Sequence, residues 1–204
     1  MKRILTTVLF FTALLLIACN SAPEKKQQTD MAKVHQKAIH DTSIARQNIK
    51  EVSPSFTNTD AKAIAAFKVM VDKYLDLKNA LANNDEGEAK KKGKELFEAI
   101  SKVDISLLND EQRKVYMQEE EDLKENAEHI GKSEIEHQRM HFSILSQGIY
   151  AIVKAFGGGR SLYHIYCSKA ENGEGAMWLS DAIDSKDPYN VKDTSCFNII
   201  EKIK

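Results

Sequence analysis

The sequence predicts an all-α fold: an antiparallel four-helix bundle with a small, irregular and partly β C-terminal cap. Apolar residues recur at helical spacing in four segments between residues 60 and 156. Short connections with helix-capping residues separate these segments, and such connections favour antiparallel neighbours. After the glycines at 157–159, short apolar pieces alternate with turn-rich pieces, which predicts the cap.

The N-terminus has the pattern of an export signal. Lys2 and Arg3 precede the apolar run "ILTTVLFFTALLLIA", which is short for a membrane span. The run ends at Cys19, and "LIAC" resembles the processing site of a bacterial lipoprotein. We therefore expect a signal peptide at 1–18, a lipidated Cys19, and a protein anchored by lipid in the bacterial cell envelope, facing the periplasm. An ordinary secreted signal is the alternative.

The segment 19–59 is predicted to be a flexible tether, because its polar composition buries too little apolar surface to offset ordering. The domain then covers 60–204. Removing 1–18 takes away two basic residues and no acidic one, so the net charge of −1 becomes about −3. This balance argues against a nucleic-acid partner. The run "KKKGK" at 90–94 lies among acidic residues and predicts a solvated helix face.

The first three helices have clear starts. A helix is predicted from Asp60 to about Asn83, with apolar residues at helical spacing. "DEGE" at 85–88 and "NDEQ" at 109–112 are capping patterns that predict the starts of the second and third helices.

Gly131 is predicted to end the third helix in a left-handed conformation. "SEIE" at 133–136 is then predicted to be a capping box that starts a fourth helix running to about Phe156. In the cap that follows, Trp178 is expected to be the apolar anchor on the bundle.

The stretch "HIGKSEIEHQRMHF" contains His129, His137 and His141. The last two lie four residues apart at the border of the apolar face, so their imidazoles project from adjacent turns and can bind one metal ion. His129 precedes the turn, and an antiparallel hairpin can bring it towards them. The alternative is that these are border histidines bonded to carboxylates such as Glu134 or Glu136.

Sulfur donors lie in the predicted cap: the thiols of Cys167 and Cys196 and the thioether of Met177. Together with imidazole they suit Cu(I) or Zn²⁺ better than Mg²⁺ or Ca²⁺. The competing interpretation is a disulfide, since exported cysteines pair by default. Closing about thirty residues would stabilise the fold by roughly 3 to 4 kcal/mol.

No enzyme is predicted. His164 precedes Cys167 by three residues, and in a strand the two side chains point to opposite faces, which prevents a nucleophile and base pair. The sequence also contains no haem-attachment, zinc-protease or serine-hydrolase motif.

Several segments in order resemble a family of bacterial envelope proteins, the domain-of-unknown-function family DUF3347. These segments are "YLDLKNAL", "HIGKSEIEHQRMHFSILS", "LYHIYCSKA", "GAMWLS" and "DPYN" followed by Cys196, within about 60–202. Members are often lipoproteins, and the same domain also occurs attached to membrane-fusion subunits of heavy-metal efflux systems.

The resemblance implies His129, His137, His141, Cys167 and Cys196 as contacts for copper or a related heavy metal. The sequence departs from the family's Cys-Pro-Met-Ala, because "CSKA" has Lys169 where the methionine is usual. The family's Cys-Gly becomes "CF" at 196–197. We therefore expect a lipid-anchored binding protein for copper or another soft metal connected with efflux, and the alternative is a non-catalytic interaction module with a structural disulfide.

Overall fold

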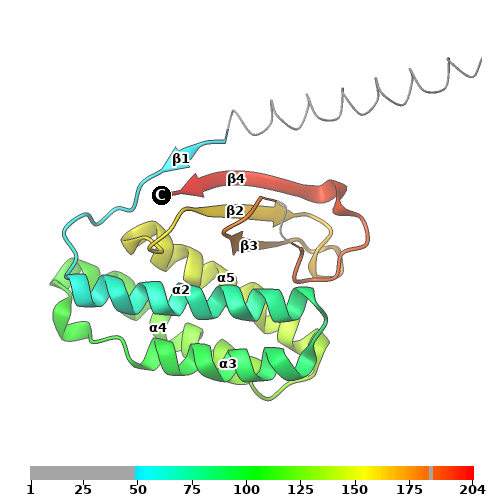
Figure 1. The fold of residues 1–204 in the computed structure, drawn as a ribbon, viewed down its shortest axis with the longest axis horizontal. Helices are drawn as coiled ribbons and strands as arrows, with labels where there is room; N and C mark the ends of the chain where they lie inside the picture. Colours follow the sequence, from blue (N-terminus) through cyan, green and yellow to red (C-terminus); the bar gives the residue numbers. More distant parts are fainter. Residues whose placement is uncertain (1–48, 184–185) are drawn as a thin grey trace, which may run out of the picture. The chain divides into compact units, whose positions relative to one another are not determined.

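The computed structural model describes residues 49–183 and 186–204. Four helices follow one another (Figure 1): α2 (Ala61–Ala82), α3 (Glu86–Ser101), α4 (Asp110–Ile130) and α5 (Ile135–Phe156). The four predicted helices are confirmed. Among the described residues, no helix is both long and apolar enough to cross a membrane. The predicted signal peptide, Cys19 and most of the predicted tether lie outside the described residues.

The C-terminal part forms a sheet, so the all-α prediction is only partly right. The strands are β1 (Glu51–Val52), β2 (Leu162–Cys167), β3 (Ala176–Ser180) and β4 (Phe197–Ile203), in the spatial order β1-β4-β2-β3. β1 is parallel to β4, whereas β2 is antiparallel to both β3 and β4. The sheet lies beside the helices (Figure 1), and short 3-10 turns, η2 (Glu171–Gly173) and η3 (Thr194–Cys196), connect its strands.

Residues 49–59, which were expected in the tether, pack on the domain. Val52 is paired with Ile203 in the β1–β4 ladder, and the ring of Phe56 lies 5.3 Å from that of Phe156. These two apolar side chains give this segment the buried surface that the polar residues around it lack. These residues accordingly belong to the compact unit that contains the helices.

The helix starts follow local capping chemistry. Asp85 accepts a hydrogen bond from the backbone N–H of Glu88 at 2.9 Å. Asn109 and Gln112 form a reciprocal capping box with bonds of 2.9 and 3.1 Å. Both predicted starts are therefore confirmed, because each depends only on residues three positions apart.

The turn between α4 and α5 differs from the prediction. Gly131 has a right-handed backbone with φ −63°, not a left-handed one. The capping residue of α5 is Glu134, which makes no side-chain capping bond. Ser133 is not the cap because its hydroxyl donates to the backbone carbonyl of His129 at 2.7 Å. The serine thus closes the end of α4 and does not open α5.

Glycines allow α3 to approach this turn closely. A Cβ atom on Gly93 would lie 2.9 Å from both the backbone nitrogen of Gly131 and Cγ2 of Ile130. A Cβ atom on Gly131 would lie 3.0 Å from Cγ of Lys94. The close fit between α3 and the turn therefore depends on the absence of side chains at both positions.

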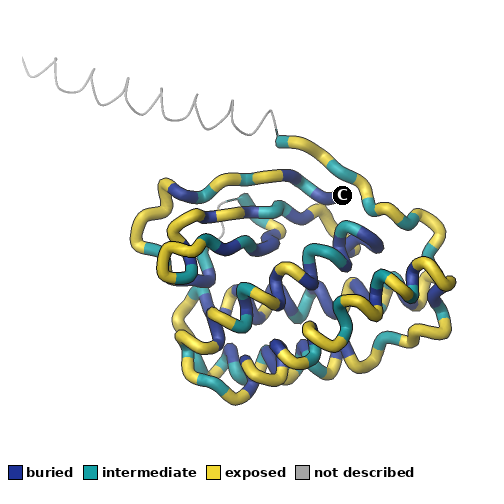
Figure 2. Tube along the Cα trace, turned by 180° about the vertical axis from the view of Figure 1, so that it is seen from behind, coloured by how far each residue is buried: buried dark blue, intermediate teal, exposed yellow. Residues whose placement is uncertain are grey.

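The core lies between the helices and extends to the sheet. Figure 2 shows buried and exposed residues alternating along the helices, as amphipathic helices require. Trp178 on β3 is fully buried, and its ring meets those of Phe197 at 5.2 Å and Tyr189 at 6.0 Å. Trp178 is therefore an apolar anchor, as predicted.

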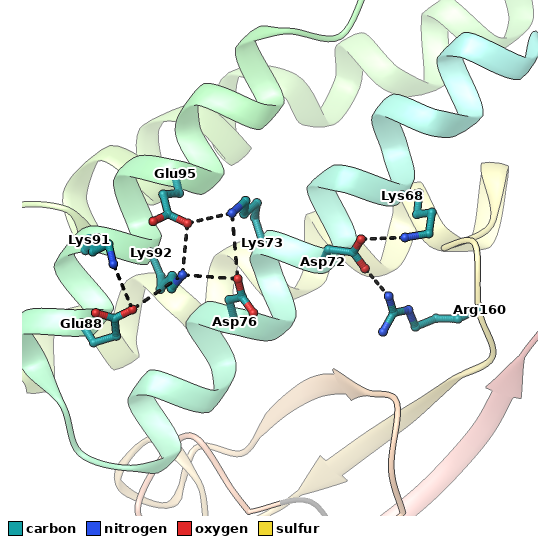
Figure 3. A network of polar contacts seen from close by, with 9 residues as sticks. All are labelled: Lys68, Asp72, Lys73, Asp76, Glu88, Lys91, Lys92, Glu95 and Arg160. Atoms are coloured by element: carbon teal, nitrogen blue, oxygen red, sulfur yellow. Dashed lines mark hydrogen bonds and ion pairs between the residues drawn. The ribbon is translucent and has the colours of Figure 1, made fainter.

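Charged side chains connect α2, α3 and the segment after α5 at the surface (Figure 3). Lys92 contacts Glu95 at 3.2 Å and Asp76 at 3.4 Å, while Lys73 contacts Glu95 at 2.8 Å. Arg160 pairs with Asp72. The lysines of the "KKKGK" run thus lie among carboxylates on a solvated helix face, and each exposed pair contributes little to stability.

Candidate functional site

The three histidines of the opening motif meet at the turn between α4 and α5. His129 comes from the last turn of α4, and His137 and His141 come from the first half of α5. The ring of His141 lies between the other two, with centroids 4.5 Å from His129 and 4.8 Å from His137. The rings are nearly parallel, at interplanar angles of 11° and 19°. We call this group the histidine stack.

His141 is the fixed member of the histidine stack. Its Nδ1 lies 2.9 Å from Oδ1 of Asn126, a buried residue of α4. Its Nε2 is buried and has no hydrogen-bond partner among the described residues. Burial lowers the pKa of His141, and the charges of His129 and His137 lower it further, while Glu125 opposes the shift. The central imidazole is therefore held in its neutral form near pH 7.

The two outer histidines of the stack are less constrained than His141. His129 and His137 are exposed, and Nε2 of His129 lies 3.8 Å from a carboxylate oxygen of Glu125. If His141 were only a polar residue at the border of the apolar face, we expected it to bond a carboxylate. Its partner is instead the amide of Asn126. Sequence reasoning missed Asn126. A signal existed, since it precedes His129 by three residues and therefore lies on the same side of α4.

The rings do not converge on one point as they lie here. Nitrogen lone pairs point outward in the plane of each ring, so those of parallel rings run side by side. Within the described residues, no group of three His, Cys, Asp or Glu side chains is arranged to hold a metal ion. The two outer imidazoles are exposed, so their side chains can change rotamer more easily than that of His141.

The predicted sulfur donors lie elsewhere in the fold. Cys167 and Cys196 form a disulfide that spans 29 residues and joins the end of β2 to the start of β4. Lys169 pairs with Asp193 across the same two segments. Met177 lies on β3 and lines a pocket of about 380 Å³ with residues from the middle of α5 and from β2. In this form the cysteines provide no thiolate.

An acidic pocket lies beside His137. It has a volume of about 360 Å³, and its lining includes Met140 of α5 and Glu171 of η2. Burial raises the pKa of Glu171, and the nearby carboxylates of Glu136 and Glu174 raise it further. Arg139 donates to Glu136 at 2.7 Å and so balances part of this negative charge.

A second polar cluster occupies the other end of α5. Tyr150 and Lys154 donate to the same oxygen of Glu201 at 2.8 and 3.0 Å. His164 is opposite Glu201 in the β2–β4 ladder, and its ring lies 4.4 Å from that of Tyr150. Sequence reasoning missed this cluster. Tyr150 and Lys154 stand four residues apart on one helix face, but nothing local connects them to β4.

Comparisons with known proteins support the family assignment. Residues 70–161 match the family described as "Protein of unknown function (DUF3347)". The matched segment covers α3, α4, α5 and part of α2, and it contains Asn126 and the histidine stack. No curated protein and no solved structure matches the chain. Over residues 70–161, somewhat less than half of its length, the chain is similar to the DUF3347 family of proteins of unknown function.

Proposed function

We propose that this protein is a non-catalytic, lipid-anchored binding protein of the bacterial cell envelope that faces the periplasm and holds copper or a related soft metal. The proposed ligands are His129, His137 and His141. The observation that carries the proposal is the contact of three imidazoles around a neutral His141 whose Nε2 has no hydrogen-bond partner. The resemblance to domains attached to heavy-metal efflux subunits supports an efflux assembly as the receiver of the metal.

The available donor atoms limit which metal ions can bind. While Cys167 and Cys196 form a disulfide, the histidine stack provides imidazole nitrogens only. Imidazole suits Zn²⁺ and copper, whereas a site for Cu(I) gains from thiolate or thioether donors. We therefore expect Zn²⁺ or Cu²⁺ to bind the oxidised protein. If Cu(I) binding requires reduction, the cysteine pair controls access to a softer site.

The proposal needs the α4–α5 pair to run antiparallel, as expected for the predicted bundle. Two contacts support this direction: His141 meets Asn126, while a Cβ atom on Gly148, further along α5, would lie 2.9 Å from Leu123, which is earlier on α4. In such a hairpin the last turn of α4 and the first turns of α5 remain neighbours. A metal bound there would bridge the two helices.

The experiment is a competition titration of the mature protein with Zn²⁺ and a chromophoric chelator. The double change His137→Ala, His141→Ala should lower the affinity at least tenfold, about 1.4 kcal/mol. His164→Ala is the matched control, because it removes a half-buried histidine outside the stack. Equal affinities in the wild type and the double variant would contradict the proposal.

The second candidate is a non-catalytic interaction module without a metal. It is favoured by the structural disulfide and by two exposed apolar side chains on α5, Met140 at 43% and Ile144 at 47% exposure. These lie one helical turn apart, next to the histidine stack. The same titration separates the candidates, since this module would bind Zn²⁺ no better than micromolar with or without the two histidines.

A further inference from the structure

The orientation of the Asn126 amide determines which nitrogen of His141 carries the proton. Its Nδ2 lies 2.7 Å from the backbone carbonyl of Asp122, which only accepts hydrogen bonds. The amide NH₂ must therefore point at that carbonyl, and the amide oxygen must point at His141. An amide oxygen only accepts, so Nδ1 of His141 must be the donor across the 2.9 Å contact.

A neutral imidazole has one N–H and one lone pair. With the proton on Nδ1, the lone pair is on Nε2, the nitrogen that has no partner among the described residues. A second proton on Nε2 would bury a positive charge and an N–H without an acceptor among the described residues, so the neutral form is favoured. An imidazole that donates through one nitrogen and binds metal through the other is the usual arrangement of a histidine ligand, since the outer bond fixes both the tautomer and the ring plane.

We propose that Asn126 is a positioning residue that holds His141 in the Nδ1–H tautomer and thereby selects Nε2 as the metal-binding nitrogen. The second half of this statement rests on the proposed function. The first half concerns the metal-free protein. Asn126 is 6% exposed, and its amide contacts Nδ1 of His141, so it would act on a metal only through the imidazole.

Replacements at Asn126 show whether this residue acts as a hydrogen-bond acceptor or only fills space. Asn126→Asp keeps an acceptor at the same place, so the tautomer should be retained. Its added negative charge raises the pKa of His141, and the pH midpoint of Zn²⁺ binding should move upward because protons compete at higher pH. Asn126→Leu keeps the branching at Cγ and removes the acceptor. The tautomer should become mixed and the Zn²⁺ affinity should fall about 10- to 100-fold.

The experiment measures the two ring nitrogens of His141 by ¹⁵N-edited NMR in the metal-free, oxidised protein, followed by Zn²⁺ titration across pH. Gln118→Asp is the matched control. It adds the same charge to an exposed position eight residues earlier on α4, so the tautomer and the pH midpoint should stay as in the wild type. Asn126→Asp alone tests the proposal should the leucine variant fail to fold.

A protonated Nε2 in the wild type would overturn the proposal, as would an unchanged tautomer in Asn126→Leu. A pH midpoint that moves equally in Asn126→Asp and Gln118→Asp would also contradict it, because a general charge effect would then account for the shift. If the tautomers follow the expectation and Zn²⁺ fails to bind the wild type, the metal-binding function is wrong while the tautomer control by Asn126 stands.

Discussion

Two half-buried histidines, His141 on α5 and His164 on β2, lie near different ends of α5 and have opposite surroundings. His141 meets two further imidazoles and an amide, and only Glu125 opposes the lowering of its pKa. His164 faces Glu201, whose carboxylate already accepts from Tyr150 and Lys154. Burial lowers the pKa of both histidines. At the sheet end a carboxylate is already paired with a lysine and a tyrosine, whereas at the turn end the central imidazole is bonded to a neutral amide. In both histidines one buried ring nitrogen, Nδ1 of His164 and Nε2 of His141, has no hydrogen-bond partner among the described residues.

The disulfide should stabilise the fold without providing a ligand to the histidine stack. The double change Cys167→Ser, Cys196→Ser should lower the free energy of unfolding by about 3 to 4 kcal/mol, because the bond closes a loop of 29 residues. Urea denaturation of the oxidised wild type and the variant measures the loss. The Zn²⁺ affinity of the oxidised wild type and that of the variant should agree. A large change in affinity would mean that the disulfide and the histidine stack are coupled.

The paired charges at the sheet end should contribute a smaller stabilisation. Glu201→Gln leaves Lys154 and Tyr150 without a charged acceptor in a buried place, so we expect a loss of about 1 to 2 kcal/mol, reduced because Lys154 is partly exposed. Glu51→Gln is the matched control. It removes an exposed carboxylate that pairs with Lys202 and Lys204 on the same sheet. Equal losses in the two variants would show that burial of Glu201 is unimportant.

The burial of His141 and His164 should make stability depend on pH. This effect should be the smallest of the three predicted effects on stability. A histidine whose pKa is lower in the folded than in the unfolded chain binds fewer protons when folded. Its contribution is therefore complete above the unfolded pKa of about 6.5 and is lost as the pH falls below it. Melting temperatures should drop between pH 7.5 and 5.5. His141→Gln and His164→Gln should each flatten the profile, and an unchanged slope in both would contradict the assigned burial.

Much of the bundle could be predicted from local features of the sequence. Contacts between residues far apart in the sequence could not be predicted in this way. Asp85 and the Asn109–Gln112 pair act over three residues, so the sequence reveals them directly. The failure at Ser133 arose because its hydroxyl has two competing backbone partners and bonds His129. The register of β1 is out of reach of such rules, since Glu51 pairs with Lys202 across 151 positions.

The candidate site was predictable to the same extent. One-turn spacing on one helix places His137 beside His141, and a short hairpin allows His129 to join them. The distance between the rings and the role of Asn126 depend on how two helices are packed and rotated against each other. No spacing rule provides this rotation. A disulfide and a metal site were competing uses for the same cysteines until the fold joined both sulfurs in a bond between β2 and β4.

The contact between Gly93 and the α4–α5 turn offers a way to change the spacing of the proposed metal ligands. One methyl group at position 93 would press on Ile130 and on the backbone of Gly131, next to His129 in the chain. The turn would have to shift outward, and the imidazole of His129 would move with it. His141 would stay bonded to Asn126. Ligand spacing could therefore be altered by evolution or by design from α3, a helix that supplies no donor, without changing any histidine.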